Sequence, residues 1–428
     1  MKRYIKLLVV LGIILVGSFS FYLFKGYKRD ALVYENNKIK PSSSGIAMML
    51  ETSAGSGNYE MTTRSEWPTE GYVFNANLSK CENGSELSWD NENKKVLMSG
   101  NKSDKCYVYF DVIQVLLADY VKSLYTGTQG ENGIYYHDAS LTDGAGDNSY
   151  RFAGASDAVN NYVCFGSAQS PCPTDNLYRI IGVFGDKVKL IKSDYATSTL
   201  LGTDGDYKQA YTATWYSSSS YKGNNLANVA AYTWNYKNNT TINSGYGSNT
   251  WSTSLLNKTN LNKNFITNIG ADWAAKIDTT TWKVGGNTDF NVGTQPAKTA
   301  YQNEIVSPVT TNSTDNKTEY SAKVGLMYAS DYMYAVPQDK WTLVGHNSDA
   351  SKDYRAATSV NWMYMGLYEW TISRDADYAY SVFYVRNTGV LNSYYALGVY
   401  GVRPVFYLTS SVNYVSGSGI AADPITIN

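Results

Sequence analysis

The sequence predicts an α+β protein, and three patterns along the chain support this class. Residues 71–111 alternate between apolar and polar side chains, as strands with one buried face do. Residues 112–125 and 251–264 instead repeat their apolar residues with helical spacing. Apolar runs of strand length dominate much of the rest, and an apolar share of 43% over 428 residues is enough for a sizeable core.

The composition indicates an exported protein with a weakly charged surface. Charged residues make up 17% of the chain, against about 25% in typical soluble proteins. Tyrosine alone contributes 39 residues, so Tyr, Asn, Ser and Thr must cover much of the surface. The formal net charge is −1, and we therefore expect no electrostatic attraction to nucleic acid.

The N-terminus has the pattern of a membrane anchor. A basic leader, 1–6, precedes an uncharged apolar run of 18 residues at 7–24, and further basic residues follow. This pattern favours an uncleaved signal-anchor at 1–29 over a cleaved signal peptide, because Ser18-Phe19-Ser20 is a poor cleavage site and the apolar run continues beyond it. We expect a single-pass protein of the cell membrane, with the bulk of the chain extracellular.

The cysteines agree with export. Four cysteines allow three pairings, of which the local one, Cys81 with Cys106 and Cys164 with Cys172, is the simplest. Free thiols or a zinc site are the alternatives. Neither pair has C-x-x-C spacing and no histidine is near, which disfavours zinc.

The chain divides by composition into a linker and two folded parts. Residues 30–70 are polar and rich in Ser and Gly, so we interpret them as a stalk or linker. Residues 71–110 form a small β unit and residues 111–428 a mixed α+β unit. The mixed unit is expected to contain a helix at 112–125 capped by Asp111, a hairpin at 177–191, helices at 251–264 and 273–277, and a strand at 324–329.

The most informative stretch lies near the C-terminus. Six tyrosines fall between Tyr378 and Tyr400, and Tyr offers a large, stiff, amphipathic contact surface at low entropic cost. In residues 378–385, Tyr378, Tyr380 and Tyr384 are predicted to lie on one side of a strand. We assign Ser381, Phe383 and Val385, on the other side, to the core. The candidate ligand-binding residues are Asp375, Tyr378, Tyr380, Tyr384, Arg386, Asn387, Asn392, Tyr394, Tyr395 and Tyr400.

The order of several motifs resembles a known group of domains. The motifs are Tyr178-Arg-Ile-Ile-Gly-Val183, Trp251-Ser-x-Ser-Leu-Leu-Asn257, Val324-Gly-Leu-Met-Tyr-Ala329, Trp370-x-x-Ser-Arg374, Phe383-Tyr-Val-x-x-x-Gly389 and Gly401-Val-Arg-Pro-Val405. Over 111–428 the chain resembles a bacterial surface domain with a C-type-lectin-like fold. That domain is akin to the formylglycine-generating-enzyme fold and to variable proteins of diversity-generating retroelements. The resemblance implies a receptor or adhesin with a diversifiable face at 375–400 and an extracellular protein or glycan as ligand.

The residues that enzymes of this fold require are not in this sequence. No cysteine follows Cys172, whereas the sulfatase-modifying oxidases use a copper-binding cysteine pair in the C-terminal half. His137 and His346 are too few for a histidine metal site. The acidic turns at 143–148 and 204–206 are assigned to turn chemistry rather than calcium. We therefore predict a binding protein with no catalytic residues, metal or cofactor. A divergent formylglycine-generating-type enzyme and a minor pilin-like subunit remain as alternatives.

One charged residue of the C-terminal motif is expected to be structural. Arg403 stands in an apolar strand and is followed by Pro404. A buried arginine must be paired, so a salt bridge or a clamp on backbone carbonyls is expected there in preference to a ligand contact.

Overall fold

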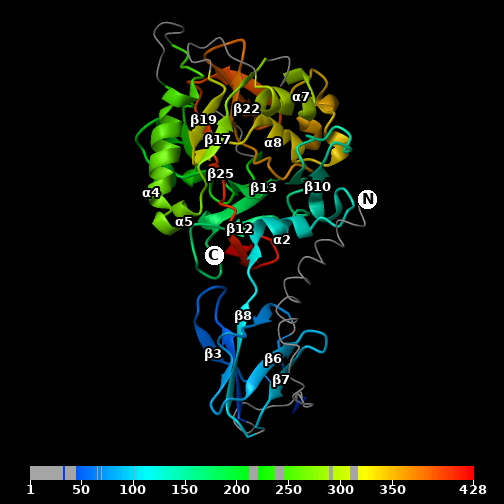
Figure 1. Ribbon diagram of the computed structural model, residues 1–428. Coiled ribbons are helices and arrows are strands. Elements are labelled where there is room, and N and C mark those ends of the chain that lie inside the picture. Colours follow the sequence, from blue (N-terminus) through cyan, green and yellow to red (C-terminus); the bar gives the residue numbers. More distant parts are fainter. Residues whose placement is uncertain are drawn as a thin grey trace. The chain divides into compact units, whose positions relative to one another are not determined.

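The computed structural model describes residues 32–33, 45–64, 66–68, 70–101, 103–211, 220–236, 245–288, 293–308 and 317–428. The chain is an α+β protein that divides into two units, Met1–Gln114 and Val115–Asn428 (Figure 1). The signal-anchor predicted at 1–29 lies outside the described residues. Within the described ranges, no helix has both the length and the hydropathy of a membrane span.

The described residues of the first unit form two β-sheets. One has the strand order β3-β2-β8-β4, with β5 also paired to β8, and the other has the order β1-β7-β6. The strands are β1 (Leu32–Val33), β2 (Ile46–Glu51), β3 (Tyr59–Met61), β4 (Tyr72–Phe74), β5 (Lys80–Cys81), β6 (Glu86–Asp90), β7 (Lys95–Ser99) and β8 (Cys106–Val112).

Both sheets contribute to one small core. Alternate residues of β2 and β8, such as Met48 and Phe110, are buried together with Met98 of β7. The predicted linker at 30–70 is therefore wrong for residues 46–61, which form β2 and β3. Alternation at Ile46, Met48 and Leu50 is the strand signal within that polar segment.

The predicted disulfides are confirmed. Cys81 of β5 is bonded to Cys106 of β8, where the two residues are also strand partners. Cys164 is bonded to Cys172 across a short loop of the second unit.

The second unit is built on two larger sheets. The first has the order β10-β11-β13-β14-β25-β20, with β12 paired to β13. Its strands are β10 (Ile134–His137), β11 (Ser149–Phe152), β12 (Tyr162–Cys164), β13 (Leu177–Phe184), β14 (Lys187–Lys192), β20 (Val324–Gly325) and β25 (Val405–Tyr407). The predicted hairpin is β13 and β14, and its register shifts between Ile180 and Gly182. Position 182 requires glycine, because a Cβ there would lie 2.3 Å from the carbonyl oxygen of Tyr150.

The second sheet of this unit has the order β15-β16-β24-β21-β22-β23, with β18 parallel to β21. Its strands are β15 (Tyr207–Ala210), β16 (Ala230–Tyr232), β18 (Gly286–Asn287), β21 (Glu369–Asp375), β22 (Ser381–Val385), β23 (Leu391–Tyr395) and β24 (Tyr400–Gly401). Smaller pairings involve β9 (Val115–Leu116), β17 (Thr280–Lys283), β19 (Glu319–Ala322), β26 (Asn413–Ser416) and β27 (Thr426–Ile427).

Helices flank the strands of the second unit. In Figure 1, α4 and α5 lie to one side of these strands, and α7 and α8 to the other. The α-helices are α2 (Leu117–Ser123), α3 (Ser198–Leu201), α4 (Ile266–Asn268), α5 (Ala271–Ala275), α7 (Ala297–Tyr301) and α8 (Ala329–Tyr334), and the π-helices are η6 (Leu256–Phe265) and η7 (Gln302–Val306). The 3₁₀ turns are η1 (Glu131–Gly133), η2 (Thr174–Asn176), η4 (Leu226–Asn228), η5 (Trp251–Thr253), η8 (Gln338–Lys340), η9 (Ala350–Lys352) and η10 (Tyr354–Ala357).

Two helix predictions need correction. The helix expected at 112–125 begins only at Leu117, because β8 continues through Val112 and the chain then pairs again as β9. Asp111 is consequently no cap; it lies in β8 and accepts hydrogen bonds from Tyr59 and Asn75. The segment at 251–264 is helical as predicted, although it is a 3₁₀ turn followed by a π-helix rather than an α-helix.

The core of the second unit is centred on aromatic rings of the first sheet. Phe406 of β25 is fully buried, and its ring centroid lies 4.8 Å from that of Phe165 and 5.5 Å from that of Tyr178. Phe265 of η6 contacts Phe406 as well, at 5.8 Å. This cluster therefore joins the π-helix to the sheet.

Truncation of Phe406 tests the importance of this cluster. We expect Phe406→Ala to lower the free energy of unfolding by about 3–5 kcal/mol, because a cavity replaces a buried ring. Val415→Ala, at a position 49% exposed, should change it by no more than about 0.5 kcal/mol. Urea denaturation measures both variants, and equal losses would contradict the assigned core.

Candidate functional site

The C-terminal tyrosines gather where β21, β22 and β23 are joined. Strand β22 pairs antiparallel with β21 and with β23, and Ser381 lies opposite Tyr395. Tyr378 and Tyr380 precede β22 in the connection from β21, whereas Tyr394 and Tyr395 end β23. The amide of Ala396 donates a hydrogen bond to the carbonyl of Tyr380 at 2.8 Å, so both segments meet at one end of the sheet.

A buried asparagine holds the loop that carries two of these tyrosines. The side-chain amide nitrogen of Asn249 lies 2.9, 3.0 and 3.2 Å from the carbonyl oxygens of Asp375, Tyr378 and Ser381. Asn249 is fully buried. The backbone between β21 and β22 is thereby fixed without any contribution from the tyrosine side chains.

Together with Tyr246, these residues form what we call the tyrosine patch: Tyr246, Tyr378, Tyr380, Tyr394 and Tyr395. Tyr378, Tyr394, Tyr246 and Tyr395 are 47%, 46%, 42% and 38% exposed, and Tyr380 is half-buried. Neighbouring rings touch, with centroid distances of 4.4 Å for Tyr246–Tyr395, 5.6 Å for Tyr378–Tyr380 and 5.0 Å for Tyr394–Tyr395. Burial raises the pKa of Tyr380, and the neighbouring phenol of Tyr395 raises it further by a smaller amount. The phenols of such a patch can donate and accept hydrogen bonds, and their rings can stack.

Three predicted residues lie beneath the patch rather than in it. Tyr384 and Tyr400 are only 5% and 3% exposed, and Asp375 is buried. The rings of Tyr384 and Tyr400 contact each other with centroids 4.7 Å apart, and Tyr400 also contacts Trp370 of β21 at 4.3 Å. The parity prediction is wrong for Tyr384, because every residue of β22 is buried and the strand has no solvent-facing side.

The predicted polar residues are separated from the patch by the length of β22. Arg386 and Asn387 follow Val385, at the opposite end of this strand from Ser381 and Tyr395. Both are half-buried, and the carbonyl of Asn387 accepts a hydrogen bond from the Tyr364 hydroxyl. Asn392 is also half-buried and lies opposite Tyr384, one pair from the Val385–Leu391 end of the ladder.

Tyr246 is the patch residue that sequence reasoning missed. It follows the Asn- and Ser-containing stretch 238–244 and is far from the C-terminal tyrosines in the chain. Its carbonyl accepts a hydrogen bond from the amide of Leu397 at 3.2 Å, which places its ring beside Tyr395. One sequence signal could have identified it. Tyr246 stands between two glycines, and segment 376–398 likewise combines tyrosines with small residues.

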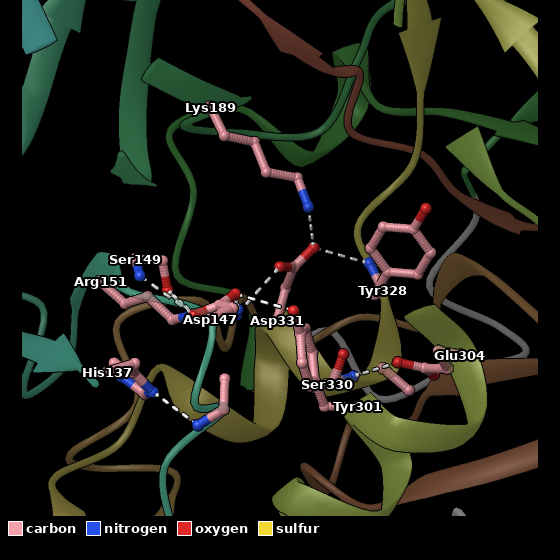
Figure 2. Close-up of polar contacts among 12 residues, drawn as sticks. His137, Asp147, Ser149, Arg151, Lys189, Tyr301, Glu304, Tyr328, Ser330 and Asp331 are labelled. Carbon is pink, nitrogen blue, oxygen red and sulfur yellow. Dashed lines mark hydrogen bonds and ion pairs between the residues drawn. The ribbon is translucent and has the colours of Figure 1, made fainter. Parts of the chain in front are cut away.

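A second group of polar residues is buried in the interior of the same unit. Figure 2 shows Lys189 of β14 and Arg151 of β11 directed at Asp331 of α8. The Lys189 Nζ lies 2.5 Å from Asp331 Oδ2, and Arg151 Nη2 lies 2.7 Å from Asp147 Oδ2. Lys189, Arg151 and Asp331 are buried, so alternating charges join the first sheet to α8.

Glu304 of η7 extends this buried group. Its carboxylate accepts a hydrogen bond from the amide of Ser330 at 3.1 Å (Figure 2). It also accepts a hydrogen bond from the hydroxyl of Ser373 at 2.5 Å. Burial raises the pKa of Glu304 to about 7, while its hydrogen bonds oppose the rise. Glu304 therefore titrates near neutral pH inside the protein.

The histidines and acidic turns have local structural contacts. His137 is buried between Tyr334 and Trp341, and its Nδ1 accepts a hydrogen bond from the amide of Ala145, while burial holds its pKa well below the usual range. Asp206 accepts hydrogen bonds from the amides of Leu255 and Leu256 at the start of η6. In the described ranges, no cluster of three or more His, Cys, Asp or Glu side chains is placed to hold a metal ion.

Arg403 forms the buried salt bridge that the sequence predicts. Its Nε lies 2.7 Å from Glu369 Oε1, and its Nη2 lies 3.0 Å from Oε2. The same Nη2 donates to the carbonyl of Met363 at 2.7 Å, and both charged residues are buried. Arg374 is buried as well and donates to the carbonyl of Lys317 at 2.8 Å.

Comparisons of the chain with models of protein families, with curated proteins and with solved structures find no match. The function must therefore be argued from the residues of the site.

The titration of Glu304 predicts a dependence of stability on pH. The folded pKa of about 7 exceeds the ordinary value of 4.5. Folding therefore binds a proton between these values, and this contribution to stability is complete below pH 4.5 and is lost as pH rises through 7. Glu304→Gln cannot ionise. The wild type should therefore lose about 3 kcal/mol of unfolding free energy relative to this variant as pH rises from 4.5 to 8.

Chemical denaturation across this pH range checks the effect. Glu131→Gln is the matched control, because Glu131 is exposed and takes part in no ion pair of the described residues. The difference in unfolding free energy between this control and the wild type should change little with pH. A pH-independent difference for Glu304→Gln would contradict the assigned titration.

Proposed function

We propose that this protein is a cell-surface ligand-binding protein, a receptor or adhesin, whose ligand binds to the tyrosine patch. The observation that carries the proposal is the contiguous exposure of Tyr246, Tyr378, Tyr394 and Tyr395 around the half-buried Tyr380. Contiguous exposed aromatic surface is rare in proteins that bind nothing there. We further propose that residues 111–428 form a C-type-lectin-like head, as their motifs suggest.

The physical state of the patch favours binding. Its rings already contact one another and its loop is anchored by Asn249, so little side-chain and loop freedom is left to lose on binding. Tyrosine also combines apolar area with a hydroxyl, which suits both protein and glycan surfaces. An extracellular protein or a glycan is therefore the ligand class that we propose.

Export and anchoring complete the proposal. The two disulfides fit an oxidising, extracytoplasmic environment. The basic leader and apolar run of residues 1–29 would serve as a single-pass anchor that leaves the bulk of the chain extracellular. Residues 375–400 would be the diversified segment. A reverse transcriptase gene and a near-repeat of these codons in the neighbouring DNA would support that part of the proposal.

Tyrosine truncation tests the binding face. We expect Tyr378→Ala and Tyr395→Ala to weaken binding of a ligand found by screening glycans and surface proteins by at least about 1–2 kcal/mol, as hot-spot aromatics do. Their stability should change by no more than about 0.5 kcal/mol, because both side chains are partly exposed. Affinity is measured by surface plasmon resonance, and stability by thermal melts of the same samples.

Two further variants make the result specific. Tyr107→Ala removes a tyrosine of the first unit that is 38% exposed and should bind normally. Tyr384→Ala removes a buried ring beneath the patch and should lower the melting temperature. Equal affinity in the patch variants and in Tyr107→Ala would reject the patch as the binding face.

Cell fractionation tests export and anchoring. We expect the full chain in the membrane fraction, with its original N-terminus and with residues of the second unit accessible to protease added to intact cells. Recovery of the bulk in the cytosol would reject export. A new N-terminus near Phe21 would indicate cleavage instead of anchoring.

A further inference from the structure

A polar cavity lies at the other edge of the sheet that carries the tyrosine patch. Its volume is about 470 Å³, within the range of small-molecule sites. Ala210 and Ala230 contribute β15 and β16, which are separated from β22 and β23 by β24 and β21 in the strand order. Segments far apart in the chain, including η2, α3, η4 and α4, supply the rest of the wall.

One buried cation lies in this wall. Lys192, at the end of β14, is only 2% exposed. Its Nζ donates a hydrogen bond to the backbone carbonyl of Asp175 at 3.0 Å. Its Nζ also lies 5.8 Å from the ring centroid of Tyr178. It forms no ion pair with a carboxylate of the described residues, although an ammonium group has three donors. A buried charge without a counter-ion is costly.

The rest of the wall combines neutral polar residues with the aliphatic residues Leu200, Ala210, Ala227, Val229 and Ala230. Ser198 and Thr199 of α3 contribute hydroxyls, and Asn228 of η4 contributes an exposed amide. These three side chains make no hydrogen bond with other described residues. Asp175 adds one carboxylate, which is exposed to solvent. Burial lowers the pKa of Lys192, whereas the carboxylates of Asp175 and Asp194 oppose this effect.

We propose that this cavity binds a small hydroxylated monocarboxylate, the chemistry of an acidic monosaccharide, with its carboxylate on Lys192 and its hydroxyls on Ser198, Thr199 and Asn228. A single buried ammonium matches a single negative charge. The exposed carboxylate of Asp175 disfavours a dianion such as phosphate, because the second charge would meet no further cation in the described wall. Hydroxyl and amide groups match a polyhydroxylated ligand better than an aliphatic one.

Ligand titrations with the full chain in detergent test the proposal. The probes are glucuronate, gluconate and N-acetylneuraminate, with glucose and inorganic phosphate as comparators. We expect at least one acid to bind, and glucose and phosphate to bind at least about tenfold more weakly, the effect of losing or mismatching one charged hydrogen bond. Calorimetry gives the dissociation constants, and saturation-transfer NMR detects weak binding.

Variants locate the site and guard against misfolding. Lys192→Gln should weaken binding of the acid by about tenfold or more, whereas Lys258→Gln removes an exposed lysine outside the wall and should have no effect. Because Lys192→Gln alters a buried residue, Asn228→Asp and Ala210→Trp provide tests at exposed positions. The first adds a negative charge to the wall and the second fills the cavity, so both should weaken binding with unchanged melting temperature.

Each outcome decides the proposal. Failure of all three acids to bind would overturn it, as would equal affinity for glucose and glucuronate. Acid binding that is unaffected in Asn228→Asp and Ala210→Trp but lost in Tyr378→Ala would place the ligand on the tyrosine patch and overturn this site. Normal acid binding by Tyr378→Ala, with loss in the cavity variants, is the result expected.

Discussion

The buried pair of Arg403 and Glu369 is the interaction on which the sheet that carries the tyrosine patch depends. Glu369 begins β21 and lies opposite both Gly401 of β24 and Val385 of β22. Arg403, just beyond β24, binds both carboxylate oxygens and also the carbonyl of Met363. One guanidinium therefore fixes the register of β21 against β24 and ties a distant turn to them. Removal of either partner would leave an uncompensated buried charge, which costs about 3–5 kcal/mol.

From this pair a continuous series of aromatic rings leads to the surface. Trp370 follows Glu369 and contacts Tyr400 at 4.3 Å, Tyr400 contacts Tyr384 at 4.7 Å, and Tyr384 reaches Tyr394 at 6.4 Å. The indole of Trp370 also donates to the carbonyl of Tyr232 in β16. The buried tyrosines thus support the exposed ones, so the rings of the patch rest on a surface whose position is set by the salt bridge and the sheet.

The sequence predicted the parts of this arrangement that depend on local pattern. The β13–β14 hairpin, both disulfides and the buried pairing of Arg403 follow from apolar runs, spacing and the cost of burying a charge. It failed where burial depends on the tertiary structure. Tyr384 has the parity of Tyr380, and no local feature of the sequence reveals that both sides of β22 are covered.

The sequence predicted that the candidate site is rich in tyrosine, but it did not predict which residues form the site. Tyr246 joins the patch through a backbone contact with Leu397, which no pattern near either residue indicates. The charges of the interior were equally hidden, because Lys189, Asp331 and Arg151 come from separate elements and meet only in the folded chain. Residue spacing predicts contacts only between residues that are close in the sequence. The assembly of such a group depends on the topology of both sheets.

In the tyrosine patch, the contacts that hold the backbone do not involve the exposed side chains. Asn249 binds the carbonyl oxygens of Asp375, Tyr378 and Ser381, groups that every amino acid carries. The fold of this loop therefore does not require tyrosine at positions 378 and 380. Residues that the fold does require, such as Phe383 and Tyr384, are buried in β22. Exposed side chains at this end of the sheet can accordingly change while the backbone that carries them is retained, which is the physical condition that the proposed diversified face requires.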